Sequence, residues 1–298
     1  LRKAPRPGLS ILMEKLGIVP STLDSEDLAM KIIPCLNAAG RLYLADLAVK
    51  ILFPGADLYD AVDKMISLNK KRRELSTKIL SQVEVSDDSD FQYVLTNEDW
   101  SVGVLSSVAS RICCERNAPV ALVASVGEVM RGTLRMPNGG DAVGVLKMLA
   151  PLLNTWGGHR LAAGFSVKQE HWFELRNEME RVLSKVLVKG EKEDLLYWTP
   201  GNLSIDIWRQ GEELGPFGME NPSPKLYSPN DGEIRISPMG KNGKHVKIDL
   251  GSSTLLGFGA AEMVEDMDSL VGWVYKPRID TWRSMTSLQL VLDKMVVM

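Results

Sequence analysis

The sequence has few of the residues that build metal and disulfide sites. Its 298 residues include three histidines and three cysteines. The cysteines, Cys35, Cys113 and Cys114, are odd in number and contain no C-x-x-C pair, which argues against a disulfide framework and against a zinc site. We interpret them as buried, unreactive thiols and expect a reducing, cytoplasmic environment.

Long apolar runs and an excess of positive charge are also missing. No apolar stretch approaches the roughly 18 residues that a membrane span needs, and Arg2-Lys3 is followed by prolines rather than by the apolar segment of a signal peptide. We therefore expect no membrane partner. The formal net charge of −3 excludes a global basic field, so any site for nucleic acid has to be a local patch.

The composition that remains is ordinary for a globular protein. Hydrophobic residues make up 45% and charged residues 24%, and the length predicts two domains with a helical connector. The chain begins at Leu1, within a basic phrase that contains prolines, rather than with methionine. We expect it to be a piece of a longer protein.

Residues 1–82 carry a helical pattern. Apolar residues in 7–18 recur at the i, i+3, i+4, i+7 spacing of an amphipathic helix, and a second such stretch follows at 44–53. A long third stretch, 58–82, has a cationic middle at residues 70–73, which we interpret as a solvated helix face. Residues 1–82 are therefore predicted to form a helical connector.

Two further domains are predicted beyond this connector. From residue 83, β-type runs alternate with helical ones, which indicates an α/β domain over 83–192 that ends in a charged stretch. From residue 193, short segments alternate apolar with polar residues between Gly, Pro and Asn. They favour a small antiparallel barrel such as an OB-fold over 193–298. The predicted fold class is α/β and β, multidomain.

The stretch "NTWGGHRLAAGF" (154–165) carries the sharpest functional signal. The paired glycines Gly157 and Gly158 can expose consecutive backbone N–H groups as an anion-binding nest, and His159 can add a donor to a phosphate oxygen. Small residues after the histidine let the next element pack closely behind. The alternative is a Gly-Gly turn with an incidental histidine.

Two arginine phrases precede this stretch. In "PCLNAAGRL" (34–42), Asn37 and Arg41 lie four apart on one predicted helix face that is otherwise bare, which suits a nucleotide backbone. A tight helix crossing is the alternative. In "RGTLRM" (131–136), Thr133 and Arg135 share a strand face with Arg131 and can form a phosphate clamp. A polar edge strand explains that pattern equally well.

Cationic residues also occur elsewhere on the chain. Arg111 is a lone arginine on a small, apolar predicted helix, and a structural salt bridge explains it about as well as a supporting role in binding. Lys241 and Lys244 flank the hairpin signal Asn242-Gly243 in the predicted barrel. Nearby aromatics either stack bases or fill the core: Phe217, Tyr227, Trp273, Tyr275 and Trp282.

Taken in order, these phrases resemble the C-terminal half of the RecJ family of single-strand-specific DNA exonucleases. The resemblance covers essentially the whole chain. It rests on "RPGLSILMEKLGI" and "IIPCLNAAGRL" for the connector, on "WSVGVLSSVASRI", "RGTLRM" and "WGGHRLAAGF" for the DHH-associated domain, and on "LGPFGMENPSPKL", "GKNGKHVKIDL" and "LLGFG" for the OB-fold domain. The chain departs from the family pattern at Ser101-Val102 and at Ser106 and Ser107.

The resemblance implies a function and a set of site residues. The full-length enzyme degrades single-stranded DNA from the 5′ end in repair and recombination, with Mn²⁺ or Mg²⁺ as cofactor and with single-strand-binding protein and a helicase as candidate partners. The chain is expected to bind the 5′ phosphate and adjacent backbone, with contacts from the OB domain at Lys241 and Lys244. The residues to which the resemblance assigns the phosphate and backbone are Asn37, Arg41, Arg111, Thr133, Arg135, Gly157, Gly158 and His159.

The chain lacks the residues that would cut the strand. Two-metal hydrolysis needs several carboxylates and usually histidines, whereas this sequence has no Asp-His-His phrase and its three histidines are scattered. The resemblance places the metal ligands in a DHH domain outside the chain. We therefore expect no metal bound here and no activity of the chain by itself. A non-catalytic nucleic-acid-binding scaffold is the alternative, and an enzyme acting on short oligonucleotides is a weaker third.

Overall fold

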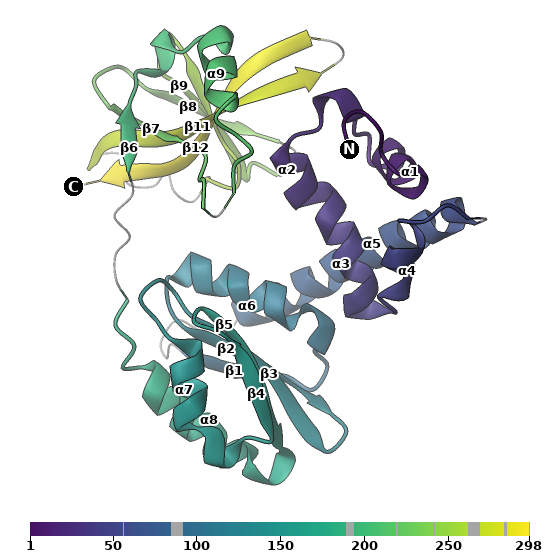
Figure 1. Cartoon of the computed structure of the whole chain (residues 1–298). Helices are drawn as coiled ribbons and strands as arrows, with labels where there is room; N and C mark the ends of the chain where they lie inside the picture. The colour runs from purple at the N-terminus through teal and green to yellow at the C-terminus, as the bar shows by residue number, and fades with distance from the viewer. Residues whose placement is uncertain are drawn as a thin grey trace. The chain divides into compact units, whose positions relative to one another are not determined.

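The computed structural model divides the chain into two compact units, Leu1–Glu191 and Lys192–Met298. The structure describes residues 1–55, 57–84, 92–188, 194–218, 220–240, 242–261, 269–282 and 285–297. Figure 1 shows the first unit in purple to teal and the second in green to yellow. Among the described helices, none combines the length and the apolar character that crossing a membrane requires.

The first unit begins with a helical segment. Its elements are α1 (Pro7–Lys15), η1 (Pro20–Thr22), α2 (Ser25–Asp27), η2 (Leu28–Ile32), α3 (Ile33–Leu42), α4 (Asp46–Lys50) and α5 (Leu58–Glu84). Pro7 stands at the start of α1, where an N–H would have no partner within the helix. The helices pack around the fully buried Leu12, Met13 and Met65. The helices predicted within 7–18, 44–53 and 58–82 are present.

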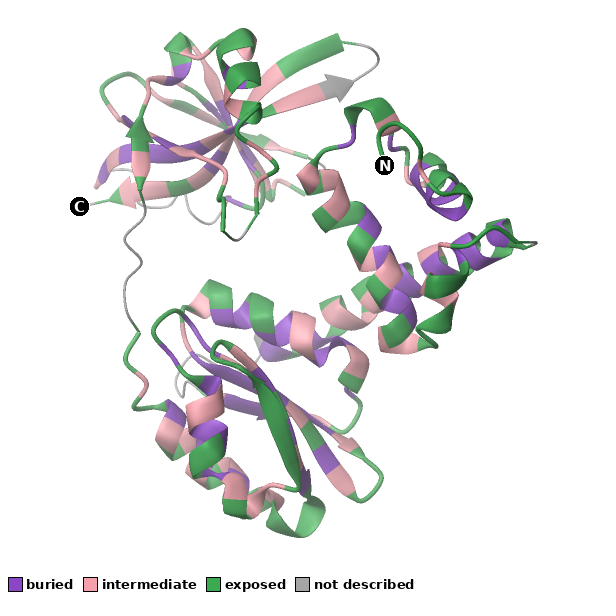
Figure 2. Ribbon diagram, viewed as in Figure 1, coloured by how far each residue is buried: buried purple, intermediate pink, exposed green. Residues whose placement is uncertain are grey.

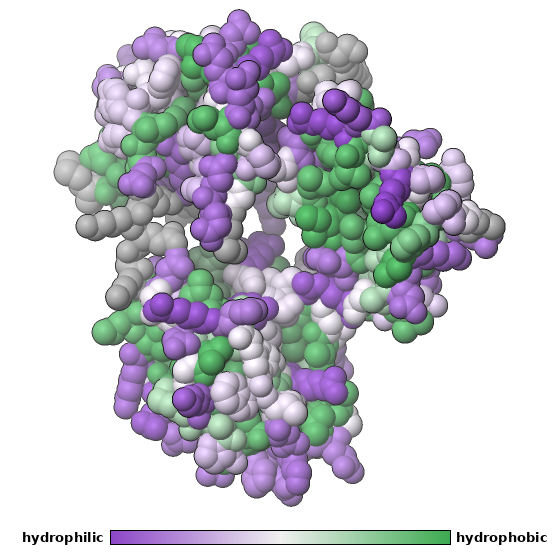
Figure 3. Space-filling view, viewed as in Figure 1, coloured by the Kyte–Doolittle hydropathy of each residue, from purple (hydrophilic) through white to green (hydrophobic). Residues whose placement is uncertain are grey.

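Apolar side chains also remain on the outside of this helical segment. Met30 is 71% exposed and Leu44 60% exposed, and Figure 3 shows a green apolar area over these helices. An exposed apolar area of this kind is typical of surfaces that meet another body. Polar groups that can bind a charged ligand lie where α3 and α5 of this segment approach the sheet that follows.

The rest of the first unit is a five-stranded sheet with helices on both faces. Its elements are β1 (Val94–Thr96), α6 (Val102–Arg116), β2 (Val120–Val126), β3 (Val129–Arg135), α7 (Ala142–Met148), η3 (Ala150–Leu152), β4 (Thr155–His159), β5 (Ala162–Lys168), η4 (Gln169–His171) and α8 (Trp172–Leu183). The strand order is β1-β2-β3-β5-β4, with β1 parallel to β2 and all other pairs antiparallel.

Alternate residues of the strands enter two separate cores. Val120 and Leu122 pack on one face against α6, whereas Val123 and Leu134 pack on the other face with residues of α7 and α8. Figure 2 shows the inner strands largely in purple and the edge strand β4 in green along its whole length. The sheet therefore has a fully exposed edge next to well-buried strands.

A carboxylate fixes the first strand to the last helix of this unit. Glu180 of α8 accepts hydrogen bonds from the backbone N–H groups of Tyr93, at 3.1 Å, and Val94, at 2.8 Å. These N–H groups begin β1, which pairs with β2 on its other side. Glu180 thus supplies partners that the edge of the sheet would otherwise lack.

The second unit is built on one seven-stranded sheet. Its elements are β6 (Leu195–Tyr197), η5 (Pro200–Asn202), α9 (Ile205–Glu212), β7 (Lys225–Pro229), β8 (Arg235–Met239), β9 (His245–Asp249), β10 (Thr254–Gly257), β11 (Leu270–Trp282) and β12 (Met285–Val297). The order is β6-β7-β11-β12-β10-β9-β8. Unlike the purely antiparallel sheet predicted from the sequence, it contains two parallel pairs, β6 with β7 and β10 with β12.

Aromatic and ionic contacts hold the second unit together. Trp273 and Tyr275 are almost completely buried, so these two candidates for base stacking are core residues, while the side chain of Trp282 lies outside the described part. Asp293 of β12 accepts hydrogen bonds from Lys225 of β7 and Lys276 of β11, each at 2.7 Å. Burial raises the pKa of Asp293, but these two ammonium groups outweigh burial and the net shift is downward.

Replacing Glu180 tests how β1 is held. Glu180→Ala leaves two N–H groups of β1 without a partner, so the free energy of unfolding should fall by about 1–3 kcal/mol, as measured by urea denaturation. Glu178→Ala on the same helix removes only an exposed ion pair with Arg181 and should leave the stability nearly unchanged. Equal losses in both variants would contradict the assigned role of Glu180.

Candidate nucleic-acid interface

Three arginines from three elements of the first unit gather at one place. Arg41 lies in the last turn of α3, Arg72 in α5 and Arg135 at the end of β3, and all three residues are half-buried. Burial lowers the pKa of Arg72 and of Arg135, and the positive charge of Arg41 lowers both further. We call these three residues the arginine cluster.

The arginine cluster has no counter-charge within the described residues. Each ion pair found there joins other side chains, and no carboxylate pairs with Arg41, Arg72 or Arg135. Like charges that are held close together and partly shielded from water disfavour the folded state. A bound anion would relieve this repulsion, and for that reason a partly buried, uncompensated cluster is a candidate binding site.

Neutral groups hold the guanidinium groups in place. The contacts are Arg41 Nη1 to Ser106 Oγ (2.7 Å), Arg72 Nε to Asn69 Oδ1 (3.0 Å), Arg135 Nε to Ser110 Oγ (2.9 Å) and Arg135 Nη1 to Thr133 Oγ1 (2.7 Å). Both serines lie on α6. This helix can approach α3 closely because Gly103 has no side chain, and a Cβ at this position would collide with the Arg41 carbonyl group. The cluster is therefore preorganised by partners that leave its charge intact.

Beside the arginine cluster, strands β3, β5 and β4 form a face of small and polar residues, which we call the platform. Directly paired residues of antiparallel strands point to the same face. The rows across the three strands are Arg131–Ser166–Thr155, Thr133–Gly164–Gly157 and Arg135–Ala162–His159. Helix α6 packs on this side of the sheet against β2 and β3, whereas β4 is exposed throughout.

The middle row of the platform, which we call its floor, contains Gly157 and Gly164, and no neighbouring atom requires glycine at either position. A Cβ at Gly157 would meet no atom within 4 Å, and one at Gly164 would reach only the Gly132 carbonyl oxygen, at 3.8 Å. Larger residues would fit at both positions and would favour the strand. Gly158 differs, because its φ is +153° and a Cβ would collide with β5. Glycine is thus required by the fold at 158, whereas at 157 and 164 it leaves the surface of the strands open.

The structure corrects the prediction of an anion nest at Gly157-Gly158-His159. These residues belong to strand β4 rather than to a turn. Successive N–H groups of a strand point to opposite sides, so they cannot converge on one oxygen atom. His159 is exposed, and its side chain makes no hydrogen bond or ion pair within the described residues. It lies two strands from Arg135, or about 10 Å by the usual strand spacing.

The other predicted site residues of the first unit take different positions. Thr133 is only 8% exposed, and its hydroxyl accepts the hydrogen bond from Arg135. Asn37 is exposed on α3, one turn before Arg41. Arg111 is exposed and pairs with Glu115 at 2.6 Å, the structural salt bridge that the alternative interpretation expected. The structure brings Arg41, Thr133 and Arg135 together and leaves Arg111 paired elsewhere.

Reasoning from the sequence missed Arg72. The cationic stretch 70–73 was interpreted as a solvated helix face, which fits Arg73 but not the half-buried Arg72. Arg72 continues the buried stripe of α5, because it follows Met65, Leu68 and Asn69 at helical spacing. An arginine at an apolar position of such a stripe is the signal that could have identified it.

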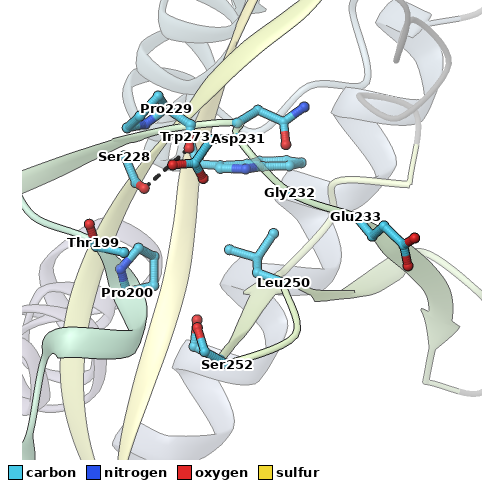
Figure 4. A pocket seen from close by; sticks show the side chains of 12 residues that line it. Thr199, Pro200, Ser228, Pro229, Asp231, Gly232, Glu233, Leu250, Ser252 and Trp273 are labelled. Atoms are coloured by element: carbon cyan, nitrogen blue, oxygen red, sulfur yellow. Dashed lines mark hydrogen bonds between the residues drawn. The ribbon is translucent and has the colours of Figure 1, made fainter.

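In the second unit, the predicted contacts lie at the hairpin between β8 and β9. Lys244 is exposed in this connection, and Lys241 lies outside the described residues. A polar cavity of about 60 Å³ opens elsewhere in this unit, beside Trp273 and Leu250 (Figure 4). The Ser228 hydroxyl on its wall donates a hydrogen bond to the Pro229 carbonyl oxygen. Its volume fits a few water molecules rather than a nucleobase.

The described residues provide no ligand set for a metal ion. Across the described ranges, no group of three or more His, Cys, Asp or Glu side chains is arranged to hold one. The side chains of the arginine cluster and of the platform are cationic, hydroxylic or small. They can bind an anion and hydrogen-bond with a neighbouring group.

Comparison with known proteins identifies the domains. Residues 88–185 match the family model described as DHHA1 domain, and residues 196–294 match the RecJ OB domain. The single-stranded-DNA-specific exonuclease RecJ of Bacillus subtilis is 26% identical, over 100% of this chain and 40% of its own length. RecJ of Dickeya dadantii is 29% identical, over 97% of this chain and 54% of its own length.

Solved structures agree with this assignment. Crystal structures of RecJ from Thermus thermophilus with Mn²⁺ and with Mg²⁺ superpose with TM-scores of 0.80 and 0.79, at 25% and 26% identity. Each covers 97% of this chain, and the chain covers 44% and 46% of theirs. The similarity to RecJ proteins thus extends over nearly the whole of this chain, and the chain spans about half the length of these relatives. The predicted α/β domain followed by an OB-type domain is confirmed.

Two glycine substitutions test the geometry of the platform. Gly157→Val should leave the midpoint of thermal unfolding unchanged or raise it, because the side chain meets open space on a strand. Gly158→Val should lower it strongly, because both its φ and its contacts require glycine. Differential scanning fluorimetry of the two variants checks the prediction. Similar losses at both positions would mean that the floor is packed rather than open.

Proposed function

We propose that this chain is the strand-binding part of a RecJ-type exonuclease that degrades single-stranded DNA in the 5′-to-3′ direction. The observation that carries the proposal is the uncompensated arginine cluster beside the bare platform. Guanidinium groups bind phosphate through paired hydrogen bonds, and the open floor leaves room for the first nucleotide. The name of the relatives, single-stranded-DNA-specific exonuclease, supports the choice of substrate.

The charge of the cluster favours the end of a strand over its middle. A terminal phosphate carries nearly two negative charges near neutral pH, whereas each internal phosphodiester carries one. In this proposal Arg41, Arg72 and Arg135 bind the 5′ phosphate, and Thr133 positions the Arg135 guanidinium. Gly157 and Gly164 lie beneath the first nucleotide, and His159, at the far side of the platform, donates to the adjacent backbone.

Peripheral residues extend the binding surface. Asn37 contacts the strand next to Arg41, and Gly158 sets the path of β4. Arg111 takes part through its exposed guanidinium only if it leaves Glu115, so its share is smaller. Lys241 and Lys244 contact the DNA backbone from the OB domain. Single-strand-binding protein and a helicase stay predicted partners.

Hydrolysis is assigned to a metal-dependent DHH domain outside this chain, in an enzyme of DNA repair and recombination. Relatives of known structure hold Mn²⁺ or Mg²⁺, and two-metal hydrolysis needs several carboxylates that bridge the ions. The described residues of this chain do not supply such a set. The chain by itself is therefore expected to bind DNA and not to cleave it.

The alternative is a binding scaffold that has lost catalysis. Nuclease assays of the complete gene product on 5′-phosphorylated single strands, with Mn²⁺ or Mg²⁺ added, separate the two. Nucleotide release by the complete product, but not by this chain, supports the enzyme. Binding without release by either one supports the scaffold, and robust release by this chain itself would contradict the assignment of hydrolysis to another domain.

Arg135→Gln tests the role of the cluster in binding the terminal phosphate. Loss of a charged donor should weaken binding to a 5′-phosphorylated strand about 10- to 100-fold and binding to a 5′-hydroxyl strand much less. Fluorescence anisotropy at fixed salt measures both affinities. Arg181→Gln is the matched control, since it removes the same charge from an exposed, ion-paired arginine outside the proposed site. Equal losses for the two strands would refute a role at the 5′ end.

A further inference from the structure

The outer face of β8, β9 and β10 in the second unit presents a second row of groups suited to nucleic acid. Val246, Ile248 and Leu255 point from these strands into the core. The residues that alternate with them point outward. By the antiparallel register, they form the rows Met239–His245, Ser237–Lys247–Leu256 and Arg235–Asp249–Thr254. The first row ends beside Phe258, the residue that follows β10.

Phe258 is the exposed aromatic residue of this face. It follows the last residue of β10 and is 54% exposed. Its ring meets the His245 ring edge to face, with 5.7 Å between the ring centroids. The ring is therefore accessible from outside the chain and can stack against a planar group.

The backbone around Phe258 keeps both rings fixed. The Gly259 N–H group donates a hydrogen bond to His245 Nδ1 at 2.8 Å, so the proton of the neutral imidazole lies on Nε2. Gly259 has a φ of +73°, a conformation that favours glycine. Gly257 is confined as well, because a Cβ would lie 2.7 Å from Val246. The pair is thus held rigidly, which lowers the entropic cost of stacking a ligand on it.

Positive charge surrounds the two rings. Lys244 is exposed immediately before His245, and Lys247 is exposed in the next row of the same face. Asp249 is the carboxylate of the three described rows, and it stands opposite Arg235, in the row farthest from Phe258. Aromatic rings flanked by cations form the arrangement that binds single strands, with bases stacked on the rings and phosphates on the cations.

We propose that Phe258 and His245 form a base-stacking site for single-stranded DNA, with Lys244 and Lys247 neutralising the adjacent phosphates. The inference rests on the proposed function and adds to it a contact to the bases, whereas the arginine cluster contacts the phosphate end. Because every base has a π face, this site binds without sequence preference. A protein partner that covers the same rings is the competing explanation.

Phe258→Ala, Phe258→Trp and Phe173→Ala test this site. Phe173 is 77% exposed on α8 of the first unit and provides a matched loss of a surface aromatic ring. The probes are oligo(dT) and an abasic strand of the same length, both with a 5′-hydroxyl group, so that the cluster for the terminal phosphate contributes little. Binding is measured by anisotropy, and circular dichroism confirms that each variant is folded.

The expected result separates stacking from charge. Phe258→Ala should weaken binding of oligo(dT) about 5- to 100-fold and should leave the abasic strand unaffected, because only the former has bases to stack. Phe258→Trp should retain or strengthen binding, and Phe173→Ala should change neither probe. An unchanged affinity of Phe258→Ala for oligo(dT), or equal losses for both probes, would overturn the stacking site.

The outcomes also separate this inference from the proposed function. If the unmodified chain binds 5′-phosphorylated strands through Arg135 while Phe258→Ala behaves like the unmodified chain, only the stacking site fails. If the unmodified chain binds neither probe nor a 5′-phosphorylated strand, both proposals fail together.

Discussion

The first unit depends on keeping like charges together without a counter-charge. Arg41, Arg72 and Arg135 come from a connector helix, a long helix and a strand, and each is partly withdrawn from water. Neutral hydroxyl and amide groups fix their positions but cannot neutralise them. Folding therefore holds repelling charges together, and in the proposed function an anion would relieve this repulsion, a recognised compromise between stability and function.

The platform beside this charge is notable for its lack of large side chains. Glycines at 157 and 164 have room for side chains yet present none, so the surface next to the arginine cluster stays flat and accessible. The OB-type unit carries a different kind of surface, with an exposed ring beside lysines. In the two proposals, the first surface binds the 5′ phosphate of a strand and the second binds its bases. Neither surface requires a particular base sequence.

Much of this organisation could be predicted from the sequence, because local periodicity and turn residues determine it. The helices of the connector and the alternation of strands and helices after it follow from apolar spacing. Arg41, Thr133 and Arg135 could be selected because polar groups on bare faces are unusual. The hairpin at Asn242-Gly243 likewise joins β8 to β9, as its turn signal indicates.

The other features of the site depend on strand register and on helix packing, and no local sequence pattern indicates either. Whether Gly157-Gly158 is a turn or an edge strand is decided by its register with β5, and that register lies outside any local pattern. Arg72 joins the site because α5 packs beside α3. Trp273 is buried because of the face that its register with β7 assigns to it, whereas Phe258 is exposed in the turn after β10.

The most direct test of the central claim is thermal unfolding of the chain with and without a 5′-phosphorylated oligonucleotide. The account predicts two opposite effects of Arg72→Gln. Without ligand, the variant should unfold at the same or a higher temperature than the unmodified chain, because a repulsive charge is removed. With ligand, the increase in the unfolding midpoint should be smaller than that of the unmodified chain. A variant that is less stable without ligand and gains the full increase with it would contradict the account.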